Sequence, residues 1–112
     1  MSRAAPIRTP DGRYIVVRGR LWRATDPGLD AETEARLKHA LGKARSDVAR
    51  AKRDRDEVLM RDARSRVQSA KVALGERGPV WWDDGARDWN RYLIKNTPYA
   101  GWWAQRGDGA GS

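Results

Sequence analysis

Basic residues recur at a seven-residue spacing through the middle of the chain, which is the arrangement that lets a helix follow a line of phosphate groups. Seven residues are nearly two helical turns, so each series forms a ridge along one side of a helix. The two series of the first predicted helix are Arg36, Lys43 and Arg50, and Lys38, Arg45 and Lys52. A third ridge on the second predicted helix holds Arg61, Arg64, Gln68 and Lys71.

Ridges of Lys and Arg neutralise phosphates without reading the base sequence. They therefore predict non-specific binding of DNA or RNA. The candidate contacts are Lys43, Arg45, Arg50, Lys52, Arg61, Arg64 and Lys71. The alternative is a solvated helix face, on which aliphatic stems cover apolar surface and local pairs such as Arg50–Asp54 neutralise charge.

A second basic pattern lies near the N-terminus, where arginines alternate with aromatic residues. Its members are Arg13, Tyr14, Arg18, Arg20, Trp22 and Arg23. Such interleaving on a ribbon is found in single-strand binders, whose rings stack on bases. We interpret Trp22 as a core anchor instead, and base stacking stays the alternative.

The tryptophans suggest a second possible binding surface. The chain has 6 Trp and no Phe. Two adjacent pairs occur, Trp81–Trp82 and Trp102–Trp103. Neighbouring side chains point in different directions, so one member of each pair should reach a surface. Because Trp is frequent in binding hot spots, Trp81 and Trp102 are the candidate contacts of a protein-interaction or homodimeric module. That is the alternative function.

No catalytic constellation is recognisable. Asp83, Asp84 and Asp88 lack the full ligand set of a calcium loop, and Asp84 is expected to cap a helix. His39 is the single histidine and has no nucleophile beside it in the sequence. Since phosphate-cradling glycine motifs are also missing, we predict a non-enzymatic protein without metal or cofactor.

Composition narrows the class of protein further. The chain has 112 residues, no Cys and a formal net charge of +8, which suits one domain and favours anionic partners. It starts without the apolar stretch of a signal peptide, and no apolar run is long enough to span a bilayer. We therefore expect a cytoplasmic protein that binds nucleic acid, itself or another protein.

The elements that position these residues follow from periodicity. Residues 10–24 predict strands that form a β-hairpin, with one bent strand as the alternative, and residues 30–77 predict an antiparallel helical hairpin capped by Asp30. The apolar stripe changes phase in the charged stretch 53–57, where we place the turn, although one continuous helix is the alternative. Small residues opposite the first stripe predict that this helix is covered on both sides: Ala35, His39, Gly42, Ser46 and Ala49.

The remaining third predicts a Trp-rich cap over residues 78–104, with one or two short helices, the first over residues 86–95. Residues 1–9 and 105–112 are expected to be flexible tails. The predicted fold is thus a single α+β domain, mainly helical, with an N-terminal β-hairpin packed on a two-helix hairpin.

Three stretches, residues 10–23, 70–82 and 96–100, resemble a family of short uncharacterised bacterial proteins that often carry the label "biopolymer transporter Tol". The resemblance extends over nearly the whole chain and implies a free-standing bacterial protein. It implies no catalytic or binding residue.

Overall fold

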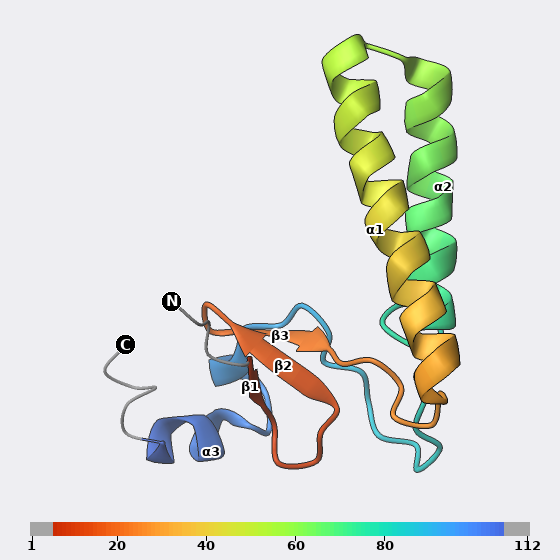
Figure 1. The fold of residues 1–112 in the computed structure, drawn as a ribbon. Coiled ribbons are helices and arrows are strands. Elements are labelled where there is room, and N and C mark those ends of the chain that lie inside the picture. Colours follow the sequence, from red (N-terminus) through yellow and green to blue (C-terminus); the bar gives the residue numbers. More distant parts are fainter. Residues whose placement is uncertain (1–5, 107–112) are drawn as a thin grey trace, which may run out of the picture. The chain divides into compact units, whose positions relative to one another are not determined.

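The computed structural model describes residues 6–106, and the chain divides into two compact units. Residues 6–24 and 82–106 form one, which we call the sheet unit. Residues 25–81 form the other, which we call the hairpin unit. Figure 1 shows their elements, and the α+β class predicted from the sequence is confirmed.

Three short antiparallel strands make the sheet, in the order β1 (Ile7–Arg8), β2 (Tyr14–Val17) and β3 (Arg20–Arg23). Arg18 and Gly19 join β2 to β3 with φ angles of 53° and 75°, the left-handed pair that a two-residue hairpin turn requires. The predicted β-hairpin is therefore confirmed. The predicted tail over residues 1–9 is wrong at β1, whose two paired residues are too few to give a periodic signal; residues 1–5 lie outside the described chain.

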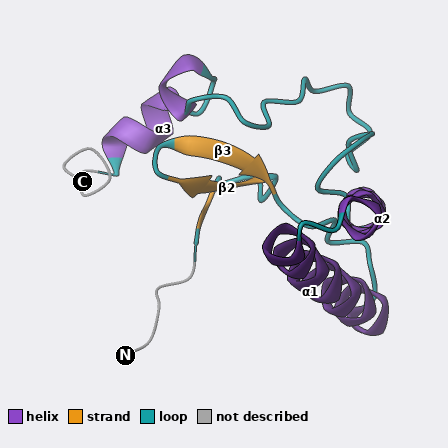
Figure 2. Cartoon of the chain, turned by 90° about the horizontal axis from the view of Figure 1, so that it is seen from above, coloured by secondary structure: helices purple, strands orange, loops and turns teal. Residues whose placement is uncertain are grey.

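The C-terminal segment runs along the free edge of β3. Leu21 accepts a hydrogen bond from Arg91 N and donates one to the carbonyl of Tyr92, at 2.7 and 2.9 Å. The segment continues into a 3₁₀ turn, η1 (Ile94–Asn96), and a short helix, α3 (Ala100–Gln105), after the long loop visible in Figure 2. Two short helical elements are thus present.

The helix predicted over residues 86–95 does not form. Arg91 has a φ of 76°, which no right-handed helix tolerates, and the carboxylate of Asp88 accepts from Asn90 N in a local turn. Gln105 belongs to α3 rather than to a tail, and residues 107–112 lie outside the described chain.

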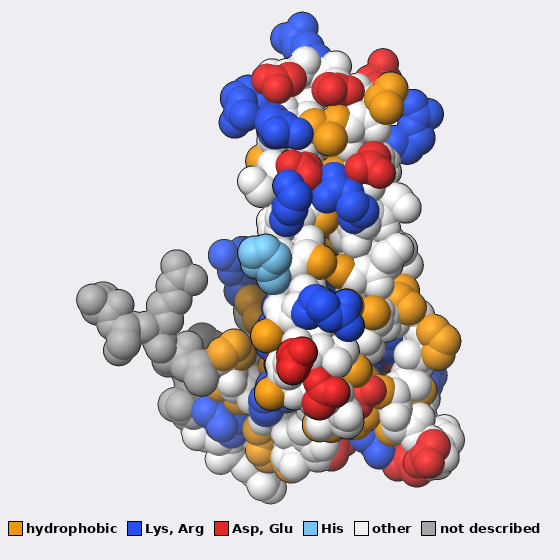
Figure 3. Space-filling view, turned by 45° about the vertical axis from the view of Figure 1, so that its right-hand side comes forward, with side chains coloured by type: hydrophobic (Ala, Val, Ile, Leu, Met, Phe, Trp, Pro, Cys, Tyr) orange, Lys and Arg blue, Asp and Glu red, His pale blue; other side chains and the backbone are white. Residues whose placement is uncertain are grey.

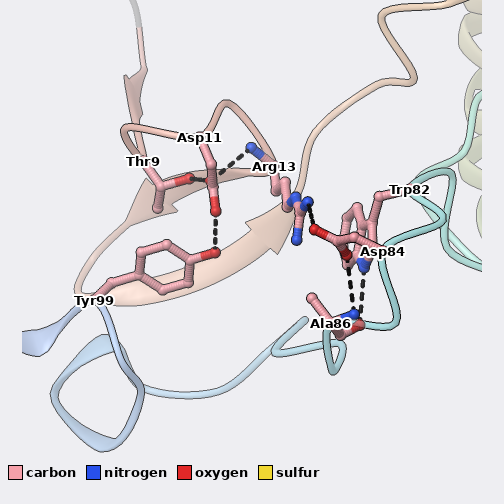
Figure 4. A network of polar contacts seen from close by, with 7 residues as sticks. All are labelled: Thr9, Asp11, Arg13, Trp82, Asp84, Ala86 and Tyr99. Atoms are coloured by element: carbon pink, nitrogen blue, oxygen red, sulfur yellow. Dashed lines mark hydrogen bonds and ion pairs between the residues drawn. The ribbon is translucent and has the colours of Figure 1, made fainter.

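Tyr14 is the centre of the sheet unit's core and is fully buried. Its ring meets those of Trp82 and Tyr99 edge-on, with centroids 5.7 and 5.6 Å apart. Polar contacts tie the same segments together (Figure 4): Tyr99 donates to Asp11 at 2.6 Å, and Arg13 donates to Asp84 at 2.5 Å. Among the described residues, the buried hydrophobic side chains of β2 and β3 lie on one face of the sheet: Tyr14, Val16 and Leu21.

The hairpin unit consists of α1 (Ala31–Asp54) and α2 (Glu57–Ala73), which pack against each other as antiparallel helices. Asp30 caps α1 by accepting from Thr33 N at 2.6 Å, as predicted. Arg55, with a φ of 53°, ends α1, and Asp56 caps α2. The hairpin with its turn in residues 53–57 is confirmed, and the continuous helix is excluded.

Packing between the two helices changes along their length. Near the base a cluster of larger side chains fills the interface: Leu29, Leu37, Leu41, Val67, Ala70 and Leu74. Toward the turn the buried positions are three alanines and one acidic residue: Ala44, Ala51, Ala63 and Asp47. The helices therefore meet through small side chains where most of the basic residues lie.

Within the hairpin unit, α1 is covered on one side only, so the second covered side that was predicted is not found there. Its small-residue side is exposed throughout, and a Cβ added at Gly42 would meet no atom within 4 Å. Helix propensity accounts for Ala35 and Ala49 on this side, whereas nothing in the structure explains Gly42. Among the helices within residues 6–106, none is long and apolar enough to cross a membrane.

Candidate nucleic-acid interface

Five of the seven predicted phosphate contacts lie on one side of the hairpin. We call this set the basic face: Arg45, Lys52, Arg61, Arg64 and Lys71. Arg45 and Lys52 are seven residues apart on α1, and Arg64 and Lys71 are seven apart on α2, so each pair follows its helix axis. Two independent observations show that the pairs share a side.

The first observation is a surface hollow of about 530 Å³ close to the α1–α2 turn. Lys52 from α1 and Arg61 and Arg64 from α2 line it together, above an apolar floor of Ala51 and Met60. Its remaining lining residues come from the turn: Arg55, Asp56 and Glu57. Cations from both helices therefore face one concave surface.

The second observation concerns Lys71, whose pKa is lowered from its ordinary value. Burial of its ammonium group is the main cause, and repulsion by Arg45 is the next. Arg45 of α1 is thus close enough to Lys71 of α2 for their two positive charges to repel each other. Glu76 opposes the shift from 4.0 Å.

Most cations of the basic face are not paired with carboxylates, although Asp56 and Glu57 line the hollow and Glu76 lies 4.0 Å from Lys71. Within residues 6–106, Arg45, Lys52, Arg61 and Arg64 make no ion pair, and all four side chains are exposed. An exposed cation without an internal counter-ion is free to meet an external anion.

The other two predicted contacts, Lys43 and Arg50, lie elsewhere. Helical positions are about 100° apart, so Lys43 is about 160° around α1 from Arg45. Lys43 and Arg50 approach the carboxylate of Asp47 to 4.0 and 3.7 Å, and Arg66 of α2 pairs with it at 2.8 Å. Asp62 extends this network by pairing with Arg66 at 2.9 Å.

We call this second set the paired face: Lys43, Asp47, Arg50, Asp62 and Arg66. Arg66 is the main reason that the pKa of Asp47 is lowered, since it donates a hydrogen bond to the ionised carboxylate; burial opposes this effect. In Figure 3, Lys and Arg side chains likewise alternate with Asp and Glu over parts of the hairpin. Charge on the paired face is largely neutralised within the molecule.

The predicted interaction residues Trp81 and Trp102 are both half-buried. The Trp102 ring lies 6.1 Å from that of Trp103, and the guanidinium of Arg106 sits 5.7 Å from it. Trp81 borders Gly75, where a Cβ would approach its ring to 2.9 Å. Both rings thus have partners inside their own unit.

Two members of the acidic cluster, Asp84 and Asp88, form ion pairs within the sheet unit. Asp84 pairs with Arg13, which lowers the pKa of Asp84, and Asp88 pairs with the buried Arg23 at 3.0 Å. Within residues 6–106, no group of three or more His, Asp or Glu side chains could hold a metal ion. His39 is exposed on α1.

Sequence reasoning missed two features of the interface. Periodicity identified the ridges but not which ridges of α1 and α2 share a side, because that depends on the rotation of each helix. Arg55 in the turn and Met60 on α2 were also missed as lining residues, since the hollow depends on how the two helices pack and leaves no motif in the sequence.

Comparison of the chain with protein-family models, with curated proteins and with solved structures finds no match. The resemblance of three segments to short bacterial proteins stays a prediction.

Proposed function

We propose that this protein is a non-enzymatic nucleic-acid-binding protein that contacts phosphates through the basic face of its helical hairpin. The observation that carries the proposal is the clustering of cations that lack carboxylate partners within residues 6–106: Arg45, Lys52, Arg61 and Arg64. The formal net charge of +8 supports it, because it draws polyanions toward the molecule.

Phosphate chemistry fits this arrangement better than recognition of bases. Arginine and lysine donate to phosphate oxygens in many orientations, whereas base reading needs a defined set of donors and acceptors at groove depth. The antiparallel helices hold the cations in two parallel rows, one on each helix, and such rows suit the regular charge of a phosphate backbone. We therefore expect low sequence specificity.

The test is fluorescence anisotropy with labelled DNA and RNA at several salt concentrations. The affinity of the wild-type protein should fall log-linearly with salt, with a slope of about −4.5 for five phosphate contacts on duplex DNA. The triple variant Arg45→Ala, Lys52→Ala, Arg64→Ala should reduce the magnitude of that slope by about 3.

A matched control comes from the paired face. Lys43→Ala with Arg50→Ala removes the same charge as Arg45→Ala with Lys52→Ala, from the same helix, but takes away cations that already face Asp47. We expect the control pair to change affinity much less than the test pair. Equal losses would show that only total charge matters and would remove the basic face from the proposal.

The alternative function, a protein-interaction module built on Trp81 and Trp102, has weaker support. Both rings are half-buried, and Trp102 packs against Trp103 and Arg106. A binding hot spot needs a ring that a partner can cover.

A further inference from the structure

The outer face of the sheet carries rows of side chains that lie outside the buried core. Strand register pairs Arg8 with Ile15 and Ile15 with Trp22, so these three residues lie side by side across β1, β2 and β3. The next row along pairs Val17 with Arg20. Alternation along each strand puts both rows on the face opposite Tyr14.

The exposed fractions of the side chains confirm that the sheet has a buried inner face and an exposed outer face. Tyr14, Val16 and Leu21 on the inner face are at most 7% exposed, whereas Val17 and Trp22 are 42% and 39% exposed. Trp22 is therefore not the core anchor that its type suggested. Tyr14 and Leu21 hold the core instead, and the Trp22 ring is left on the surface.

Arginines on the two faces differ in their partners. On the inner face Arg23 is 1% exposed and pairs with Asp88. On the outer face Arg8 and Arg20 donate to the backbone carbonyls of Gly12 and Arg91, at 3.5 and 2.5 Å. Neither makes an ion pair within residues 6–106, and no carboxylate occupies a paired position on this face.

An aromatic ring flanked by cations on an open sheet matches the chemistry of unpaired nucleotides. A base offers a flat face to the Trp22 ring, and Arg8 and Arg20 are available to the phosphates on either side of it. The strands are about 5 Å apart, so Arg8 and Trp22 are separated by about 10 Å, within the reach of one or two nucleotides. A duplex offers no free base face to the Trp22 ring, because its bases are stacked on one another.

We infer that the outer face of the sheet, formed by Arg8, Ile15, Val17, Arg20 and Trp22, binds single-stranded nucleic acid by stacking a base on Trp22. The inference rests on the proposed function for the class of ligand, but it concerns a different surface and a different part of the nucleotide. The basic face holds phosphates of any strand, whereas Trp22 selects strands whose bases are unpaired.

The test compares three labelled probes of one length: single-stranded oligothymidine, its duplex with oligoadenine, and an abasic strand with the same phosphates. Trp22→Thr removes the ring but keeps a β-branched residue suited to an exposed strand position. We expect it to weaken oligothymidine binding about tenfold and to leave duplex and abasic binding within twofold of wild type. Trp22→Phe should recover most of the loss, because it restores a ring.

Tyr92→Thr is the matched control, since it removes another ring, 40% exposed, from the same unit. It should bind all three probes as the wild-type protein does. The inference is overturned if Trp22→Thr binds oligothymidine like wild type, or if it weakens binding to all three probes equally, which would indicate a purely structural role. Far-UV circular dichroism of each variant checks that the sheet is retained.

The same probes separate this inference from the proposed function. The variant Arg45→Ala, Lys52→Ala, Arg64→Ala should weaken all three probes, because all three carry phosphates. If that variant binds like wild type while Trp22→Thr loses only oligothymidine, the hairpin proposal fails and base stacking stands. If wild type binds none of the probes at low salt, both are overturned.

Discussion

Tyr14 connects the strands to the C-terminal segment through a single hydroxyl group. The hydroxyl accepts a hydrogen bond from Trp89 N at 2.7 Å and donates one to Asp88 at 3.2 Å. Burial of the ring is the main reason that the pKa of Tyr14 rises to about 12, and the neighbouring carboxylate of Asp88 adds to it. The neutral phenol is thus the form that holds the sheet unit together.

Tyr14→Phe should therefore lower the free energy of unfolding by about 1–2 kcal/mol, because it removes two buried hydrogen bonds. The folded pKa lies above the ordinary value of 10.0, so the stabilisation is complete below pH 10 and is lost as the pH rises toward 12. Urea unfolding followed by circular dichroism at pH 8 and pH 11.5 measures this. The wild-type protein should lose more stability than Tyr14→Phe over that interval; parallel losses would contradict the assignment.

Some single-residue roles could be predicted from the sequence, and others could not. Asp30 was recognisable as a helix cap because capping depends on a few neighbouring residues. Trp22 was misassigned because its type favours burial, whereas its face is decided by the register with Ile15 and by which side residues 82–106 cover. Asp84 was predicted to cap a helix, but Arg13, distant in sequence, pairs with it instead.

The two helices of the hairpin are joined on one side by the ion-pair network of the paired face. Asp47 is its centre, and its side chain is 11% exposed between α1 and α2. The hydrogen bond from Arg66 lowers the pKa of Asp47 below its ordinary value of 3.8, against the effect of burial. The ionised carboxylate is therefore the stabilising form.

Asp47→Asn should destabilise the hairpin at pH 7, since Arg66 would lose its charged partner across the interface. A depressed carboxyl pKa gives stabilisation that is present above about pH 4 and is lost as the pH falls through the folded value. The urea midpoints of wild type and variant should therefore differ at pH 7, and the difference should be smaller at pH 2. Asp54→Asn, at the exposed end of α1, is the control and should behave like wild type at both pH values. A constant difference between wild type and Asp47→Asn would exclude this role.

The positions of the helices and their turn could be predicted from the sequence, but the way the elements pack against one another could not. The phase slip in the apolar stripe indicated the turn, because a helical periodicity persists over many residues and its interruption is visible. The rotation of α1 against α2 was not predictable, so the seven cations could not be divided into a basic face and a paired face. The loop over residues 82–93 carries no periodicity, and its course depends on hydrogen bonds to β3.

On the scale of the whole molecule, the hairpin unit is continuous in sequence, whereas the sheet unit is assembled from two separate segments. A protein of residues 25–81 alone should therefore keep its helices and unfold cooperatively on heating, because its apolar core is complete within it. Far-UV circular dichroism during a thermal scan tests this. Residues 1–24 alone should show no stable structure, since Tyr14 would lack Trp82 and Tyr99. A featureless thermal scan of residues 25–81 would contradict the division.

The backbone hydrogen bond from Asp26 N to the carbonyl of Leu74, 2.8 Å long, holds the entrance and exit of the hairpin unit together. Once the hairpin has formed, its two ends lie close together, so the connection from β3 to Trp82 acts like a much shorter loop. Each halving of a connection's effective length lowers the entropic cost of closing it by about 0.6 kcal/mol. On the ribosome the strands emerge first but stay incomplete until Trp82 and Tyr99 have been made. The order of folding should thus reverse the order of synthesis: helices first, then the sheet that precedes them.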